Sequence, residues 1–219
     1  MSLTATSLVP PASVSRLWLL ESVGALRSRV FGAVVARHRS WLGLGRAALA
    51  AGAGVKPHAL AEIEHGSLPS LAVAYAIGDA LGVDLAELVY ETESQIAGVP
   101  EPARPAVARR PRPAVTVVRN RPRAFGVAVS RYRLGLGLSL DELAERAGLC
   151  VAELADIESG DLPSLGCALT LADALELPAD RMLHETRHHA TYGRDTDYCL
   201  DQMTMPRHIS SAVPSPQTT

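Results

Sequence analysis

Aromatic side chains and lysine are scarce in this sequence of 219 residues. Phe, Trp and Tyr make up 4% of it, whereas hydrophobic residues as a whole make up 47%. Any core must therefore be built from Leu, Ala and Val. Lysine occurs once, at position 56, against twenty arginines. The three cysteines are an odd number without the spacing of a metal site, so a reduced cytoplasm is the expected compartment.

Long apolar runs and catalytic motifs are also absent. No stretch approaches the roughly 20 apolar residues that span a bilayer. The apolar stretch near the start is interrupted by Glu21 and lacks a basic leader, which argues against a signal peptide. We find no glycine-rich phosphate loop, no G-x-S-x-G and no recognisable Cys–His pair. His184 and His188 have no second fixed pair of ligands. We expect no enzyme, no membrane insertion, no cofactor and no metal.

The most informative feature that is present is an internal repeat. LAEIEHGSLPSL at 60–71 returns as LADIESGDLPSL at 154–165, 94 positions later. Without gaps, residues 29–89 align with 123–183, and 26 of the 61 aligned pairs are identical. Two copies are too few for a solenoid. They predict two small domains of one fold.

Each copy shows helical spacing and turn signals but no strand signal. In the second copy, Ser139 and Glu142 have the spacing of a capping box, and Gly148 is placed to end that helix. Ser164 is placed to cap the fourth helix. The copy therefore reads as five short helices. The first copy has the same order, with helices expected at 30–41, 46–52, 57–65, 70–81 and 84–92.

Two of these helices, separated by Gly-x-x, give a helix-turn-helix pattern. GLSLDELAERAGLCVAELADIESG at 137–160 closely resembles the Cro/C1-type (XRE) helix-turn-helix domain. GLGRAALAAGAGVKPHALAEIEHG at 43–66 resembles it more loosely. The family's internal ion pair between the first and third helices falls on Arg39 with Glu64, and on Arg133 with Glu158.

The resemblance implies an all-α protein with two tandem five-helix, lambda-repressor-like domains joined by a Pro/Arg-rich linker. It also implies double-stranded DNA as the partner. The expected layout is a tail able to form an extra helix at 1–28, a first domain at 29–92, the linker at 93–122, a second domain at 123–190 and a disordered tail at 191–219.

In such a domain the third helix enters the major groove. The family's reading positions fall on Pro57, His58 and Glu62 in the first copy. His58 can donate to a guanine acceptor, and Glu62 can accept from a cytosine amino group. Arg46 and Lys56 are expected to bind phosphate at the mouth of this helix. Weaker backbone contacts are expected from His65, Ser67 and Arg37.

The second copy offers a poorer reading face. Its equivalent positions are Val151, Ala152 and Asp156, and Glu153 stands one turn before Asp156. Leu140 replaces Arg46. Residues 124–183 hold four arginines against ten acidic residues, a net of six negative charges, and such a surface repels phosphate.

The linker has the opposite charge. Residues 93–123 hold seven arginines against two glutamates, among several prolines that favour an extended spacer. These arginines can lie along phosphates, and a simple solvated tether is an equally good interpretation. The candidate DNA contacts are Arg109, Arg110 and Arg112.

The sequence therefore predicts a cytoplasmic, nucleoid-associated transcriptional regulator, with repression expected. Its first domain would read DNA, and its acidic second domain would associate with another copy of the chain, with the first domain or with a basic protein. A pseudo-dimer whose two domains contact adjacent half-sites is an alternative, and so is a protein–protein adaptor that does not bind DNA. The excess of Arg over Lys indicates GC-rich coding and hence a bacterium, phage or plasmid.

Overall fold

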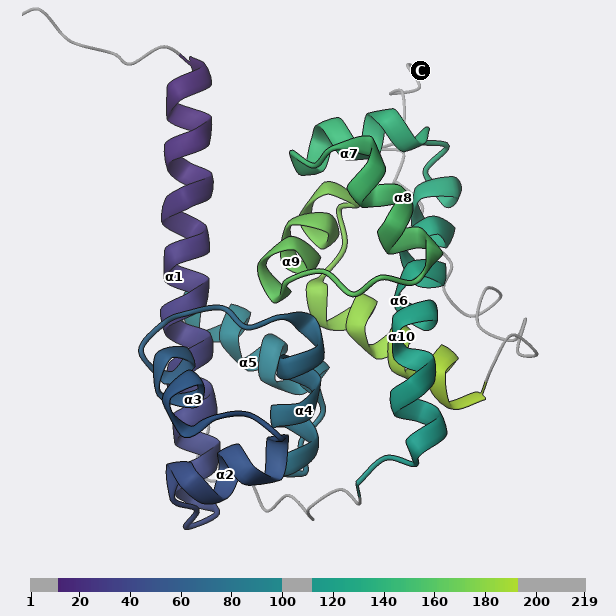
Figure 1. Ribbon diagram of the computed structural model, residues 1–219. Coiled ribbons are helices and arrows are strands. Elements are labelled where there is room, and N and C mark those ends of the chain that lie inside the picture. The colour runs from purple at the N-terminus through teal and green to yellow at the C-terminus, as the bar shows by residue number, and fades with distance from the viewer. Residues whose placement is uncertain (1–11, 100–111, 193–219) are drawn as a thin grey trace, which may run out of the picture.

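The computed structural model describes residues 12–99 and 112–192, and these ranges contain ten α-helices and no strand (Figure 1). The all-α expectation is confirmed. Arg109, Arg110 and nearly all of the expected C-terminal tail lie outside the described residues. The first repeat comprises α1 (Ala12–Trp41), α2 (Arg46–Ala53), α3 (Pro57–Glu64), α4 (Leu71–Leu81) and α5 (Leu85–Ile96). The second comprises α6 (Val115–Gly135), α7 (Leu140–Ala147), α8 (Val151–Ser159), α9 (Leu165–Ala174) and α10 (Ala179–Tyr192).

The turn of each helix-turn-helix depends on a left-handed glycine. Gly54 (φ 69°) ends α2, and Gly148 (φ 66°) ends α7. Only glycine adopts this conformation without a steric penalty from a Cβ atom. The next N–H then bonds back into the helix, from Val55 to the Ala50 carbonyl at 3.0 Å in the first repeat. Each turn therefore fixes where the following helix starts.

Side-chain caps set the other helix starts. The capping box predicted for Ser139 and Glu142 is confirmed, with N···O distances of 3.1 and 2.7 Å. Ser164 caps α9 as expected. The sequence did not suggest a second box, in which Cys150 Sγ accepts from the Glu153 N–H and Glu153 accepts from the Cys150 N–H. These caps satisfy orphan amides at the first turns of α7, α8 and α9.

A glycine lets the first helix of each repeat cross the third at very short range. A Cβ atom on Gly32 would lie 2.2 Å from the Ile63 carbonyl oxygen, and one on Gly126 would lie 2.4 Å from that of Ile157. Both distances are far below van der Waals contact. This close crossing explains why the Phe-Gly pair at positions 31 and 32 recurs at 125 and 126.

The first helix of each repeat is longer than expected. The extra helix at the N-terminus is continuous with the rest of α1. The expectation of an extended linker up to residue 122 is wrong for its last part. The chain is helical from Val115, where α6 begins, and this helix contains Pro122. A proline inside a helix costs roughly 3 kcal/mol, and the packing of α6 along α10 and the burial of Phe125 offset that cost. Arg121, counted among the linker's cationic residues, is buried.

The two repeats pack against each other. Figure 1 shows α1 and α6 on opposite flanks of the molecule, running in opposite directions. Between them α5 contacts α10, and α4 contacts α9. Buried apolar side chains of both repeats, from Phe31 to Leu183, form one connected core. The described residues therefore form a single body with two related halves.

Candidate nucleic-acid interface

Helix α3 has one face buried in the core and the opposite face exposed to solvent. Leu60 and Ile63 are buried in the core, and Lys56, Pro57, His58 and Glu62 are exposed. Lys56 is the N-cap residue, with extended backbone, and Pro57 occupies the first turn, where its missing N–H costs nothing. The four candidate residues thus share the outer face and the N-terminal end of one fixed helix.

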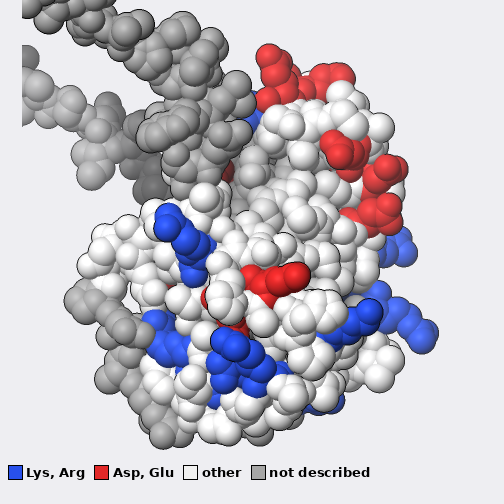
Figure 2. Space-filling view, turned by 60° about the vertical axis from the view of Figure 1, so that its left-hand side comes forward, with Lys and Arg blue, Asp and Glu red and all other residues white. Residues whose placement is uncertain are grey.

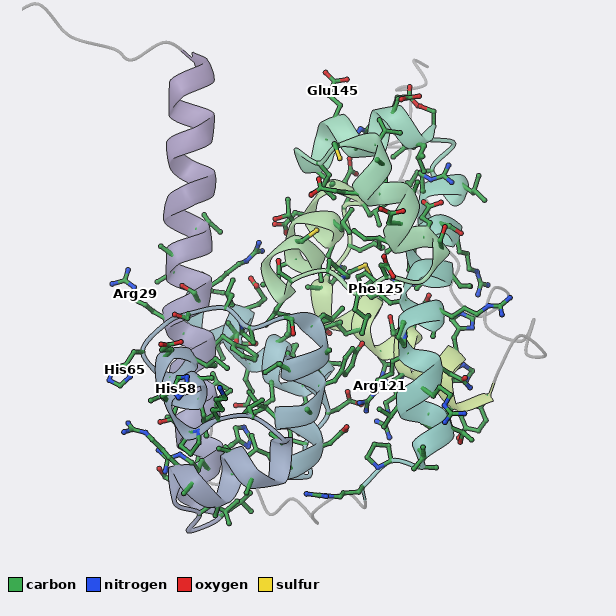
Figure 3. All side chains as sticks on the ribbon, viewed as in Figure 1. Arg29, His58, His65, Arg121, Phe125 and Glu145 are labelled. Carbon is green, nitrogen blue, oxygen red and sulfur yellow. The ribbon has the colours of Figure 1, made fainter. Side chains whose placement is uncertain are left out.

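The turn after α3 adds a cation that sequence reasoning missed. Arg29 packs over this turn, since a Cβ atom on Gly66 would lie 2.9 Å from Arg29 Cγ. Figure 3 shows Arg29 and His65 projecting from the same side of the molecule, with His58 close by on α3. Arg29 is identical to Arg123 at the start of the aligned repeats, and that identity was the one available signal.

His65 and Ser67 are both exposed on this turn. His65 Nδ1 hydrogen-bonds the Ala61 carbonyl. When Nδ1–H donates in this way, Nε2 of the neutral ring is an acceptor. His65 can therefore donate to a phosphate only when its ring is protonated.

An ion-pair cluster connects α1, α2 and α3. The Glu64 side chain, 2% exposed, accepts from Arg39 Nε at 2.6 Å and from Arg46 Nε at 2.6 Å. Arg39 also donates to the Leu44 carbonyl at 3.0 Å. Burial alone would raise the pKa of Glu64, but the two guanidinium groups outweigh it and hold the pKa below its ordinary value.

Arg46 combines an anchored position with exposure. It is bonded to Glu64 through Nε, and its side chain is 49% exposed. Arg46 is the first residue of α2, and its bond to Glu64 places it beside α3. A guanidinium held in this way loses less conformational entropy when it binds a phosphate. The structure therefore keeps Arg46 with the exposed candidates.

The structure does not bring Arg37 to this surface. Its side chain is 12% exposed and its guanidinium bonds Glu91 on α5 at 2.6 Å, with the ring of Trp41 beneath it at 5.1 Å. His38 also hydrogen-bonds Glu91, at 3.0 Å. Arg37 thus joins α1 to α5 instead of contacting the backbone of DNA. The pair was not apparent from the sequence because the two residues are 54 positions apart.

The equivalent face of the second repeat has the same scaffold and the opposite chemistry. Arg133 and Glu158 form the matching bidentate pair, at 2.7 and 2.8 Å. The exposed surface of α8 presents two apolar and two acidic side chains, at Val151, Ala152, Glu153 and Asp156. Figure 2 shows this contrast on one face: Lys and Arg lie mostly over the first repeat, around an acidic patch, and Asp and Glu predominate over the second.

One candidate of the linker lies within the described residues. Arg112 is exposed and donates to the carbonyl of Gly52 on α2, at 3.0 Å. It therefore lies against the first repeat. Its guanidinium is close to the helix-turn-helix that carries the other cations.

Comparisons with known proteins agree with this architecture. A family model described as a helix-turn-helix domain matches residues 30–89, and a second, described as helix-turn-helix, matches residues 129–181. No curated protein matches the chain. No solved structure matches it either.

None of the helices in the described part of the chain combines the length and the apolar character that a membrane crossing requires.

The two matched segments contain α2 with α3 and α7 with α8, the two helix pairs built around Gly54 and Gly148. The chain therefore carries two helix-turn-helix domains in tandem, consistent with the Cro/C1-type (XRE) family, and these domains indicate a DNA-binding regulator.

Proposed function

We propose that this protein is a sequence-specific transcriptional regulator that reads base edges through α3 of the first repeat. One observation carries the proposal. His58 and Glu62 are exposed on a helix whose opposite face is locked into the core by Leu60 and Ile63. Such a helix presents polar groups to the major groove with little freedom to reorient. We expect it to act on the nucleoid, in the cytoplasm.

The chemistry of the exposed residues divides into reading and positioning. His58 donates to a guanine N7 or O6, and Glu62 accepts from a cytosine N4 amino group. Lys56 and Arg46 bind phosphates and fix the register of the helix. Arg29 and Ser67 extend this contact beyond the end of α3, with His65 when protonated. Occupancy of a promoter excludes other proteins, so repression is the expected outcome.

The second repeat associates and does not read bases. Its α8 carries Glu153 and Asp156 where an approaching phosphate would need cations. Its α9 and α10 pack on α4 and α5 of the first repeat. This packing supports the first repeat as the partner of the second.

Selection from random duplex DNA tests this assignment. The wild-type full-length chain should enrich one motif that persists at raised salt. The variant Arg46→Ala/His58→Ala should bind more weakly and lose the preference at the base pair that His58 reads. The matched control is Leu140→Ala/Ala152→Gly, at the equivalent positions of the second repeat, and it should enrich the wild-type motif. An unchanged motif from the first variant would overturn the assignment of α3 as the reading helix.

A protein–protein adaptor is the second candidate, and the acidic surface of α8 favours it. In that case the pure chain would retain no duplex DNA at any salt concentration. A basic partner protein would instead co-purify with it, and charge reversal of Glu153 and Asp156 would release that partner.

A further inference from the structure

The two repeats meet through the same surface of each. Ser70 and Ser164 form an antiparallel bridge between the turns that precede α4 and α9. The N–H of Leu71 donates to the Pro163 carbonyl at 3.0 Å, and the N–H of Leu165 donates to the Pro69 carbonyl at 3.0 Å. Each partner in one hydrogen bond lies 94 positions from its counterpart in the other, which is the offset of the repeat.

Two ion pairs follow the same relation. Arg27 bonds Asp173 at 2.5 and 3.0 Å, and Arg121 bonds Asp79 at 2.7 and 2.8 Å. Arg27 and Arg121 are 94 positions apart, as are Asp79 and Asp173. The arginine of each repeat therefore binds the aspartate of the other. Reciprocity of this kind is the mark of an isologous, two-fold interface.

The packed helices agree with the hydrogen bonds. Helix α4 contacts α9 and α5 contacts α10, and both contacts pair a helix with its own counterpart. An interface between identical subunits of a symmetric dimer has this arrangement. Here both subunits are parts of one chain.

We propose that one chain is a built-in helix-turn-helix dimer whose association surface is filled from within, and that its target is a single asymmetric DNA site bound by one chain. Dimers of identical helix-turn-helix subunits read palindromes because both reading helices are the same. Here α3 exposes His58 and Glu62, whereas α8 exposes Ala152 and Asp156 at the same positions. The part of this proposal that concerns the DNA site rests on the proposed function of α3.

One contact favours the pairing of unlike repeats. Arg187 on α10 bonds Asp84 at the start of α5. The counterpart of Arg187 in the first repeat is Glu93, so two first repeats from different chains would place Asp84 against Glu93. Like charges at an interface disfavour the wrong partner. Because both repeats belong to one chain, each also meets the other at a high effective concentration.

Disulfide trapping at the bridge tests the built-in dimer. The native thiols are first removed as Cys150→Ser, Cys167→Ala and Cys199→Ser in the full-length chain. Residues 70 and 164 are a non-hydrogen-bonded antiparallel pair, whose Cα atoms lie roughly 4.5 Å apart in such ladders. That separation suits a disulfide. Cysteine is tolerated at a helix N-cap of this protein, as Cys150 shows.

The variant Ser70→Cys/Ser164→Cys should oxidise to a monomer containing an internal disulfide, seen as a mobility shift that a reductant reverses. Ser70→Cys alone should form no disulfide. Disulfide-linked dimers from Ser70→Cys alone would show that two first repeats meet between chains, and would overturn the built-in dimer. Linked dimers from the double variant would overturn it as well.

The stoichiometry on DNA tests the target. Light scattering of the complex with the selected duplex should give one chain per duplex, on a motif without inverted symmetry. Two chains on an inverted repeat would overturn the inference and leave the proposed function standing. Retention without any motif would overturn the proposed function and the asymmetric site together, while the trapping result still decides the built-in dimer.

Discussion

Arg121 binds Asp79 with two hydrogen bonds, at 2.7 and 2.8 Å, across the boundary between the repeats. Its guanidinium also lies 4.5 Å from the centroid of the Tyr75 ring. A bidentate pair backed by a cation–π contact is both strong and directional. This pair and its counterpart, Arg27 with Asp173, join the two repeats alongside the hydrogen bonds of the Ser70–Ser164 bridge and the packing of α5 on α10.

The two pairs should differ in their contribution to stability. Asp79 is 23% exposed, whereas Asp173 is 48% exposed. Arg121→Ala leaves a half-buried carboxylate without its cation and should lower the free energy of unfolding by on the order of 3 kcal/mol. Arg27→Ala breaks a more exposed pair with Asp173 together with a contact to the partly exposed Glu93, and it should cost about 1 kcal/mol. Urea unfolding of both variants measures the difference, and equal losses would contradict it.

The close crossing of α1 and α3 should not tolerate a methyl group. Gly32→Ala places a Cβ atom 2.2 Å from the Ile63 carbonyl oxygen, so α3 must move outward. A loss of about 3 kcal/mol in unfolding free energy is expected, at the upper end of overpacking effects. The control is Gly24→Ala in the same helix, where no atom lies within 4 Å. Its midpoint in urea should rise, since Ala is the better helix former. A neutral Gly32→Ala variant would contradict the geometry.

Glu64 should make stability depend on acid. Burial opposes its charge, yet Arg39 and Arg46 hold its pKa below the ordinary value in the folded chain. A depressed folded pKa means that the stabilisation is complete above the unfolded pKa and is lost as pH falls through the folded one. The gap in unfolding free energy between wild type and Glu64→Gln should therefore be full at neutral pH and close in acid. Glu62→Gln, exposed on the same helix, is the control and should show no gap at neutral pH. A gap that persisted in acid would argue against the ion-pair cluster as its source.

Phosphate binding and base reading should separate experimentally. Lys56→Ala should weaken binding to every duplex and reduce the salt dependence by about one counterion, because it removes one phosphate contact. His58→Ala should keep the salt slope and relax specificity at one base pair, at about 1–3 kcal/mol. Fluorescence titrations over a range of salt, with the selected motif and its point variants, distinguish the two. Identical behaviour of the two variants would refute the division of roles.

Local signals predicted much of the fold. Ser139, Glu142 and Gly148 specify the ends of α7 through hydrogen bonds and backbone angles within a few residues, so the sequence alone determines them. The helix order of the second repeat could be transferred to the first because the aligned residues share these signals. The exposed candidates around α3 were also predictable, since the helix-turn-helix spacing sets which face is buried.

Long-range partners were not predictable. Nothing near Arg37 in the sequence indicates Glu91, and nothing near Arg121 indicates Asp79. The sequence predicts Arg37 as a backbone contact for DNA, and it places Arg121 among linker arginines that can either lie along phosphates or belong to a solvated tether. Both arginines are instead paired inside the protein. The helix through Pro122 was also not predictable, because it depends on a distant partner. Helix α10 supplies the packing that offsets the missing hydrogen bond.

The reciprocal arginine–aspartate pairs have an evolutionary consequence. In a dimer of identical subunits every substitution appears twice, so neither half can change alone. When both halves are encoded in tandem, each inherits its own changes. The two repeats accordingly differ at Lys56 and Cys150 and at His58 and Ala152, while both keep the aspartate of the interface pair and the serine of the turn. A tandem chain of this kind can therefore keep the surface that joins its halves while the exposed faces of α3 and α8 carry different residues.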